Sequence, residues 1–573
     1  MVFACILLTL AAGCKRSDPS DNTSADSPNG KQAADKQSMP PLTNLARLHW
    51  LGKKRISAET NAAGFMQIWN LPPMARLESQ TIDKLALALT KRPDAAPITN
   101  YNLFITNISS FIKGPSAYLR PLLNDLLQEE FYCEFTFPGN EARQQVLLAI
   151  KLDEIRHRLW GSNLVAAAKT WAGTKASQDG NGWQIQVSSA PPMLNLLAEP
   201  KSHLLNIEVR RVADWTLVSV GQKDSVLLRD FKSRIERDHA PFVARETNYW
   251  FEAENLNLNQ LQPLVGLSLP GDLPKLSVTL IGDGENVRTR GKLSFSKPLA
   301  LELEPWIIPT NLISAPLSSF TAIRGFKPWL ESWKAWNTMK LSSAPNQLYI
   351  WALQGLPMLT YFAAPHPDAS NMVSKITQSI LQNGTNFFAT NDVVRFERSE
   401  SSGGLQWKGL PAIDPFLRGV SGKSTSFLLG GLFPIGDTNL PPPAELLKQL
   451  TAGATNLVVY DWELTGFRSE QWSNVGDFVR FGMYREQMVT QLARACIDAA
   501  TPKLGNCGSV ITLTEPNVLS FSRRSTVGFT AIELHLLADW LESPNFPSGL
   551  HSSIPVPPLV LPPAPVTGNS TNR

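Results

Sequence analysis

Long apolar runs and blocks of like charge are both scarce in this sequence of 573 residues. Charged residues make up only 18% of the chain, and the formal net charge of +4 is close to neutral for this length. The longest basic block is Lys53–Arg55, which is too small an electrostatic footprint for nucleic acid. We therefore expect no nucleic-acid partner.

Motifs for metals, nucleotides and hydrolase nucleophiles are also missing. No two of the seven histidines lie within a helical turn of each other, and Glu154 with His157, at i and i+3 on an expected helix, is better explained as a solvated surface pair than as part of a di-metal site. The tripeptide Gly422–Ser424 lacks the first glycine of a phosphate-binding loop, because Leu417 stands at that position. No Gly-x-Ser-x-Gly elbow occurs. We therefore expect neither a metal site nor a cofactor.

Only five cysteines are present. Cys133 alternates with Phe131 and Phe135, which indicates a small buried side chain in a core. Cys496 and Cys507 flank a turn, and a disulfide between them would close a short loop and add about 3 kcal/mol in the chain-entropy model. Two free thiols are the equally supported alternative.

A short apolar run opens the chain. Residues 2–13 are apolar or small apart from Thr9, and this length is too short for a helix to cross a bilayer core of about 30 Å. The run has instead the length of a signal-peptide core. The alternative is a short buried N-terminal helix or strand.

The end of this run contains a recognisable processing signal. Ala12 and Gly13 directly before Cys14 resemble the lipobox of bacterial lipoproteins. That resemblance implies that residues 1–14 form the signal peptide and lipobox, and that Cys14 carries acyl chains at the mature N-terminus. Two or more acyl chains hold a protein stably on a membrane. Lys15 is not the Asp that resembles an inner-membrane retention signal, which favours the outer membrane.

Two segments have compositions typical of disorder. Residues 15–40 contain almost no large apolar side chain and cannot bury enough surface to offset the entropy of ordering. Residues 546–573 contain many prolines, which is typical of an extended exposed tail. We therefore expect a flexible linker, a folded part within residues 41–545 and a proline-rich tail.

Apolar spacing divides the folded part into three. Residues 41–94 have mostly helical spacing, in which Leu45 and Leu48 would lie on one helix. Residues 95–310 and 311–545 then show strand and helix signals that follow the same order twice.

Short sequence matches indicate that the second and third parts are copies of one unit. Residues 277–280 (Ser-Val-Thr-Leu) resemble residues 509–513 (Ser-Val-Ile-Thr-Leu), and residues 293–296 and 519–522 both read Leu-Ser-Phe-Ser. We therefore predict an internal duplication of an α+β unit, with two largely antiparallel sheets and helices packed on one face of each.

Two pairs of carboxylates are candidates for catalysis. Glu252 with Glu254, and Asp461 with Glu463, are two residues apart on expected strands, so each pair shares one face of a sheet. Such a pair can supply the two carboxylates of a hydrolase, and both pairs stand at the same place in the two units. The commoner explanation is that polar residues alternate with apolar ones on any half-exposed strand.

Three tryptophans have helical spacing. Trp329, Trp333 and Trp336 stand at i, i+4 and i+7, which places them on one face of a helix. An exposed row could stack sugars or peptides, whereas a buried row is part of the core. We expect core, because most large aromatic side chains are buried.

The signal, the linker and the repeat order together resemble large uncharacterised bacterial lipoproteins with a duplicated α+β domain of unknown function. The resemblance implies export and a lipid anchor in the cell envelope, and it implies no activity. We expect a non-enzymatic binding or structural protein, whose partners are the membrane and an unidentified protein or small-molecule ligand. Two alternatives stay open, an envelope hydrolase that uses the carboxylate pairs and a carrier of an apolar ligand.

Overall fold

The computed structural model of this chain describes most of the expected folded part. The described residues, with short gaps inside several ranges, are 45–90, 111–136, 145–188, 204–261, 272–383, 395–433, 441–482 and 491–547. The predicted signal peptide with Cys14, the linker at 15–40 and nearly all of the tail at 546–573 lie outside them. In the part that is described, no helix is both long and apolar enough to span a bilayer.

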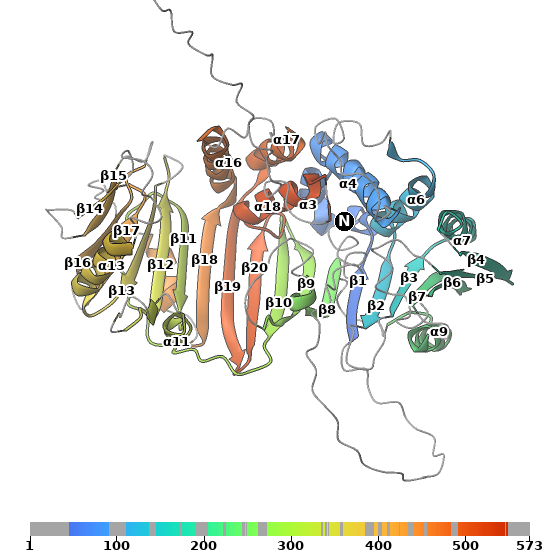
Figure 1. Cartoon of the computed structure of the whole chain (residues 1–573), viewed down its shortest axis with the longest axis horizontal. Helices are drawn as coiled ribbons and strands as arrows, with labels where there is room; N and C mark the ends of the chain where they lie inside the picture. The colour runs from blue at the N-terminus through green and yellow to red at the C-terminus, as the bar shows by residue number, and fades with distance from the viewer. Residues whose placement is uncertain are drawn as a thin grey trace, which may run out of the picture.

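An antiparallel sheet of 20 strands forms the framework of the described residues (Figure 1). The strands of the first half are β1 (Leu45–Trp50), β2 (Phe131–Thr136), β3 (Val146–Lys151), β4 (Lys175–Asp179), β5 (Gly182–Val187), β6 (Leu205–Val212), β7 (Trp215–Gly221), β8 (Phe251–Asn257), β9 (Lys275–Asp283) and β10 (Asn286–Ser294). Those of the second half are β11 (Leu317–Arg324), β12 (Gln347–Leu353), β13 (Thr360–Pro365), β14 (Arg395–Arg398), β15 (Leu405–Lys408), β16 (Phe416–Ser421), β17 (Ser426–Gly431), β18 (Leu457–Leu464), β19 (Asn506–Glu515) and β20 (Val518–Ser525).

Both halves have the same strand order when they are followed outward from the centre of the sheet. The first runs β10, β9, β8, β1, β2, β3, β7, β6, β5 and β4. The second runs β20, β19, β18, β11, β12, β13, β17, β16, β15 and β14. The halves meet where β10 pairs with β20, from Val287 opposite Ser525 to Ser294 opposite Val518. The prediction of two separate sheets is therefore wrong, because this pairing satisfies the backbone groups of two strands that would otherwise be edges.

Helices complete a mixed α+β fold, as predicted. Those of the first half are α2 (Lys53–Ser57), η1 (Thr60–Ala62), α3 (Ala63–Trp69), α4 (Pro72–Thr90), α6 (Pro115–Gln128), α7 (Glu154–Ala168), α9 (Val226–Asp238) and α10 (Leu258–Leu261). Those of the second half are α11 (Lys327–Glu331), α13 (Ala369–Asn383), α15 (Ala444–Thr451), α16 (Thr465–Gly482), α17 (Gln491–Ala500), η5 (Thr501–Lys503) and α18 (Ala531–Glu542).

The helices lie on both faces of the sheet rather than on one. In β3, Leu147 and Ala149 pack with α9, whereas Leu148 and Ile150 pack into the larger core that α4 and α6 cover. We call the side of α4 and α6 the helical face and the side of α9 the open face. Residues that are register partners lie on the same face of a sheet. Register partners can be followed from the groove, which is described in the next subsection, across the strands to β13, where they belong to the core cluster that contains α15. Helix α15 therefore also lies on the open face. Two helices thus flank the centre of the open face.

The segment predicted to be helical begins as a strand. Buried Ala46, Leu48 and Trp50 alternate with half-buried Arg47 and His49 along β1. This strand pairs with β2 on one side and β8 on the other. Backbone hydrogen bonds on both edges outweigh the near-helical spacing of the leucines, because strand preference depends on neighbouring strands more than on local sequence. Helices follow only from Lys53.

The alternating aromatic pattern of β2 is confirmed. Phe131, Cys133 and Phe135 are each 1% exposed and belong to the same core cluster. This cluster extends from the first half into α17 and α18 of the second, so the core crosses the sheet centre.

Polar contacts also join the two halves on the helical face. The side chain of Glu542, which is 1% exposed, accepts hydrogen bonds from the backbone nitrogens of Leu492 and Ala493 at 3.1 Å each. Thr81 and Lys84 of α4 donate to the carbonyl oxygen of Leu541. A buried carboxylate at the start of α17 is stabilised there by free backbone N–H groups and the helix dipole.

The sequence matches that motivated the duplication are not equivalent in the fold. Leu293 is near the end of β10, whereas Leu519 is near the start of β20, and the two residues are register partners. Ser509 accepts a hydrogen bond from Arg523 on the helical face, whereas Ser277 lines the open face. The repeated strand order therefore does not depend on these short matches.

We predict that Gly291→Ala destabilises the protein by about 1–3 kcal/mol, because overpacking forces backbone shifts. A Cβ at this position of β10 would overlap the carbonyl oxygen of Ser277 and the ring of Phe521. The matched control is Gly508→Ala in β19, where a Cβ would have no atom within 4 Å. Thermal unfolding of both variants and the wild type measures the difference. Equal unfolding midpoints for the two variants would contradict the close packing of the central strands.

Candidate functional site

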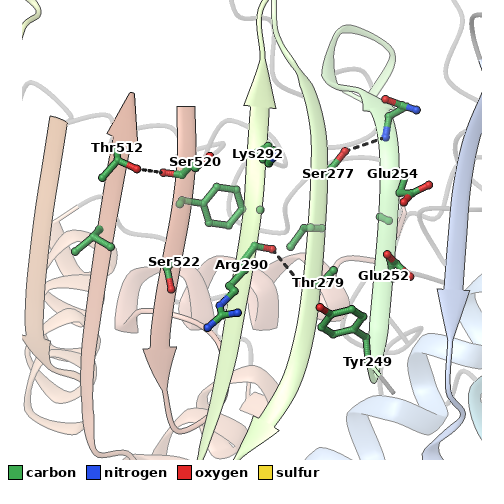
Figure 2. Close-up of a pocket in the computed structure, with 16 residues that line it drawn as sticks. Tyr249, Glu252, Glu254, Ser277, Thr279, Arg290, Lys292, Thr512, Ser520 and Ser522 are labelled. Atoms are coloured by element: carbon green, nitrogen blue, oxygen red, sulfur yellow. Dashed lines mark hydrogen bonds between the residues drawn. The ribbon is translucent and has the colours of Figure 1, made fainter. Parts of the chain in front are cut away.

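An open polar groove crosses the centre of the open face (Figure 2). Its volume is about 660 Å³, and its lining comes from β8, β9, β10, β20 and β19. Both halves of the chain therefore contribute to it, and the pairing of β10 with β20 runs through its middle.

Two rows of register partners cross the groove from strand to strand. The first row is Glu252, Thr279, Arg290, Ser522 and Val510. The second row is Ser277, Lys292, Ser520 and Thr512, with Glu254 beside Ser277 at the bulge in β8. Each of the two basic residues thus lies between hydroxyl side chains of both neighbouring strands.

The two basic side chains of the groove carry uncompensated charge. Arg290 and Lys292 are exposed and stand two residues apart on β10, about 7 Å along the strand. Among the described residues, neither side chain forms an ion pair or a hydrogen bond with another side chain. The preceding Arg288, in contrast, pairs with Asp283 at 2.6 Å. The groove therefore has two positive charges available to a ligand.

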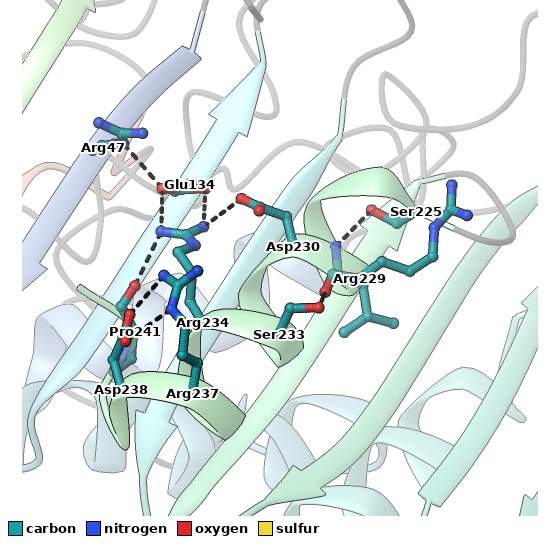
Figure 3. Close-up of polar contacts among 11 residues, drawn as sticks. Arg47, Glu134, Ser225, Arg229, Asp230, Ser233, Arg234, Arg237, Asp238 and Pro241 are labelled. Carbon is teal, nitrogen blue, oxygen red and sulfur yellow. Dashed lines mark hydrogen bonds and ion pairs between the residues drawn. The ribbon is translucent and has the colours of Figure 1, made fainter. Parts of the chain in front are cut away.

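The predicted carboxylates Glu252 and Glu254 form one wall of the same groove. As predicted, they share a face. Glu254 is 3.9 Å from the guanidinium of Arg47, which in turn donates to Glu134 at 3.0 Å. Figure 3 shows Glu134, only 1% exposed, between Arg47 and the bidentate side chain of Arg234 on α9. Glu254 is thus part of a chain of ion pairs that ends in the flanking helix.

A second charged cluster stands next to Glu252. His49, the register partner of Glu252, stacks on Tyr132 with ring centroids 4.1 Å apart, and its Nε2 is 3.2 Å from an oxygen of Glu130. Burial opposes ionisation of Glu130, but the hydrogen bond to His49 and the charge of Arg55 outweigh it and lower the pKa of Glu130. The ionised Glu130 therefore orients His49 beside the acidic wall.

Asp461 and Glu463 lie on the helical face, away from the groove. Asp461 accepts a hydrogen bond from the hydroxyl of Thr321 at 2.7 Å, and Glu463 accepts one at 2.7 Å from the backbone nitrogen of Ala531, the first residue of α18. Burial raises the pKa of both carboxyl groups. The expected equivalence with Glu252 and Glu254 is wrong, because the two pairs occupy opposite faces of one sheet.

The three tryptophans have two different environments. Trp329 and Trp333 are 58% and 47% exposed, and their rings meet edge to face with centroids 4.4 Å apart. Trp336 packs against the core cluster that contains Met372 and Val373 of α13. The expected buried row is therefore not formed: Trp336 is half-buried and the other two are exposed, since α11 ends at Glu331 and no single helix face orients all three.

The two remaining cysteine candidates are free and buried. The structure has no bond between Cys496 and Cys507, so the second alternative considered above is the one observed. Burial raises the pKa of each thiol to about 12. Neither is therefore a reactive thiolate at neutral pH.

Another cavity lies beneath the helices of the helical face. This apolar cavity of about 150 Å³ lies between the sheet and the helices that cover its helical face, and its lining includes Leu119, Leu126 and Trp160. A cavity of this size holds a molecule as small as benzene, which is much smaller than a lipid. In the described ranges no group of three His, Cys, Asp or Glu side chains could hold a metal ion.

Arg290 and Lys292 do not stand out in the sequence. Their only signal was the alternation of basic residues along β10, which is common on exposed strands. Comparisons with known proteins add no further signal: no family model, no curated protein and no solved structure matches the chain.

We predict that Glu463→Gln makes the stability of the protein less dependent on pH. Because burial raises the pKa of Glu463, the folded protein keeps a proton that the unfolded chain has already lost, so the free energy of unfolding falls as the pH rises through this range. Gln can still accept the hydrogen bond from Ala531 but cannot ionise. As the pH rises above 4.5, the usual pKa of a glutamate carboxyl group, the unfolding temperature should therefore fall less in the variant than in the wild type.

The matched control is Glu463→Ala, which also cannot ionise but removes the acceptor at the start of α18, so it should be about 1 kcal/mol less stable than Glu463→Gln at all these pH values. If Glu463→Gln keeps the full pH dependence of the wild type, the buried carboxyl group is not its source.

Proposed function

We propose that this protein is a lipid-anchored protein of the bacterial cell envelope that acts by binding a ligand in the polar groove of the open face. The observation that carries the proposal is the pair Arg290 and Lys292, with which no described side chain forms an ion pair, whereas Glu254 in the same groove is 3.9 Å from the guanidinium of Arg47. Exposed charge between rows of hydroxyl groups is a recognition surface, because the two cations stay hydrated in the free protein and a ligand of opposite charge can offset the cost of desolvating them with charge-assisted hydrogen bonds.

The hydrolase alternative has less support from the carboxylates. The pair with raised pKa values, Asp461 and Glu463, is engaged by Thr321 and by the start of α18 beneath the helices. Glu254 on the open face is tied to Arg47. A glycosidase needs one carboxyl group that stays protonated and a second that faces the same substrate, and the described carboxylates do not combine these properties in one place.

The carrier alternative also has less support. The apolar cavity beside Leu119 has about 150 Å³, and ligand pockets of proteins usually have about 300–1,000 Å³. The polar groove is within this range but is lined mainly by charged and hydroxyl side chains.

The proposal includes a tandem duplication of one α+β unit. It is supported by the identical order of ten strands in each half, with α7 and α13 following the third strand and α9 and α15 following the seventh. In this proposal the groove lies at the junction of the two copies, so a single copy could not form it.

We predict that Cys14 is acylated in the cell envelope and that Cys14→Ala leaves the protein unprocessed. The reason is that acylation of the thiol precedes cleavage of a lipoprotein signal, so the residue that resembles the lipobox cysteine is required. Mass spectrometry of the N-terminal peptide, with and without an inhibitor of lipoprotein signal peptidase, measures the modification. The matched control is Cys5→Ala in the same apolar run. An unmodified peptide that begins at Met1 in the wild type would refute the anchor.

A further inference from the structure

We infer that the ligand of the groove is an acidic glycan, whose carboxylate or sulfate groups lie over Arg290 and Lys292 on β10. This inference rests on the proposed function, because it names the ligand class of the same groove.

The charge of the ligand follows from the surroundings of the two cations. Thr279 and Ser522 flank Arg290, and Ser277 and Ser520 flank Lys292, on the two neighbouring strands. In the free protein, Thr279 donates to the carbonyl oxygen of Arg290 at 3.4 Å, and the Ser520 hydroxyl is 2.9 Å from that of Thr514. A hydroxyl group can donate to an anion that a cation attracts, so each row offers one cation and one uncommitted hydroxyl donor, Ser522 or Ser277, to one acidic group. The two rows are about 7 Å apart, which suits a ligand that has repeated acidic groups.

The hydroxyl-rich lining favours a sugar over a peptide. Peptides bind to sheets by adding a strand to a free edge or by filling apolar pockets. Every strand of the groove is paired on both edges, so no edge is available. Side chains that both donate and accept, such as Thr512 and Ser520, match the hydroxyl groups of a sugar.

The shape of the groove favours a chain over a small anion. The rows cross five strands, which is about 19 Å from β8 to β19 (Figure 2), and the groove is open rather than enclosed. An enclosed site would suit a single small anion better, because desolvation strengthens its binding. Tyr249 at the β8 end offers a ring against which a sugar can pack.

The acidic wall limits where the anionic groups can lie. Glu252 is two strands from Arg290, about 10 Å away, so it repels an acidic group on the β8 side of the groove. The acidic groups are therefore directed toward β10 and β20, and neutralising the wall should strengthen binding rather than weaken it.

The experiment is a calorimetric titration of the full chain, purified in detergent, with three probes of equal length. These are a galacturonic acid oligomer, a sulfated galactan oligomer and a neutral malto-oligomer. We expect at least one acidic probe to bind, and the neutral probe to bind at least about tenfold more weakly. The better acidic probe identifies carboxylate or sulfate as the preferred group. Binding should weaken as salt is added, because exposed charges are screened.

Three variants test the placement of the ligand. Arg290→Ala with Lys292→Ala should weaken binding of the acidic probe about tenfold or more. The matched control, Lys175→Ala with Arg229→Ala, removes the same charge from two exposed sites elsewhere and should stay within about twofold of wild type, because distant exposed charges are screened. Glu252→Gln with Glu254→Gln should bind as tightly as wild type or more tightly. Unfolding temperatures establish that all variants are folded.

Several outcomes would overturn the inference: equal binding of neutral and acidic probes, equal loss in the control pair, weaker binding after Glu252→Gln with Glu254→Gln, or no binding of either acidic probe. Tighter binding of single-stranded DNA than of both acidic oligomers would also overturn it. A photo-crosslinking residue at position 512, used in living cells, separates failure of the acidic-glycan inference from failure of the proposed function. Crosslinks at the groove without glycan binding would refute only the ligand class, whereas their absence would refute the binding role as well.

Discussion

The pairing of β10 with β20 is the interaction on which the rest of this structure depends. Without it the chain would form two ten-stranded sheets, each with a long unpaired edge at its inner side. The pairing closes both edges, extends one core across the junction and allows α4 to pack with α17 and α18 on the helical face. It also sets the register that places Arg290 beside Ser522 and Lys292 beside Ser520. The groove is therefore a consequence of how two halves join.

Much of the secondary structure could be predicted from local pattern. The alternation of Phe131, Cys133 and Phe135 identified a strand with one buried face, and the structure buries all three. The wrong prediction of a helix at Leu45 and Leu48 has a physical cause. Leucines three residues apart fit a helix, whereas the alternation of Arg47 and His49 with apolar residues fits a strand. Only the contacts with β2 and β8, distant in sequence, decide between these patterns.

The candidate site could be predicted only in part, since it is built by register rather than by motif. That Glu252 and Glu254 share a face follows from a period of two, and it could be derived from the sequence. Which of the two faces of the sheet they occupy could not be derived from the sequence. The apparent match with Asp461 and Glu463 was misleading, because a shift of one residue along a strand moves a side chain to the other face. The hydroxyl partners of Arg290 and Lys292 come partly from a strand of the other half, which no local pattern indicates.

The basic residues of β10 also matter before the fold is complete. A ribosome finishes β10 long before it reaches β20, so β10 is an outer strand of the nascent sheet while the whole second half is still being made. Outer strands with charged side chains resist pairing with other chains, and β10 has Arg288, Arg290 and Lys292 at alternate positions. The residues that later line the groove thus protect the growing chain from aggregation until its own C-terminal hairpin arrives.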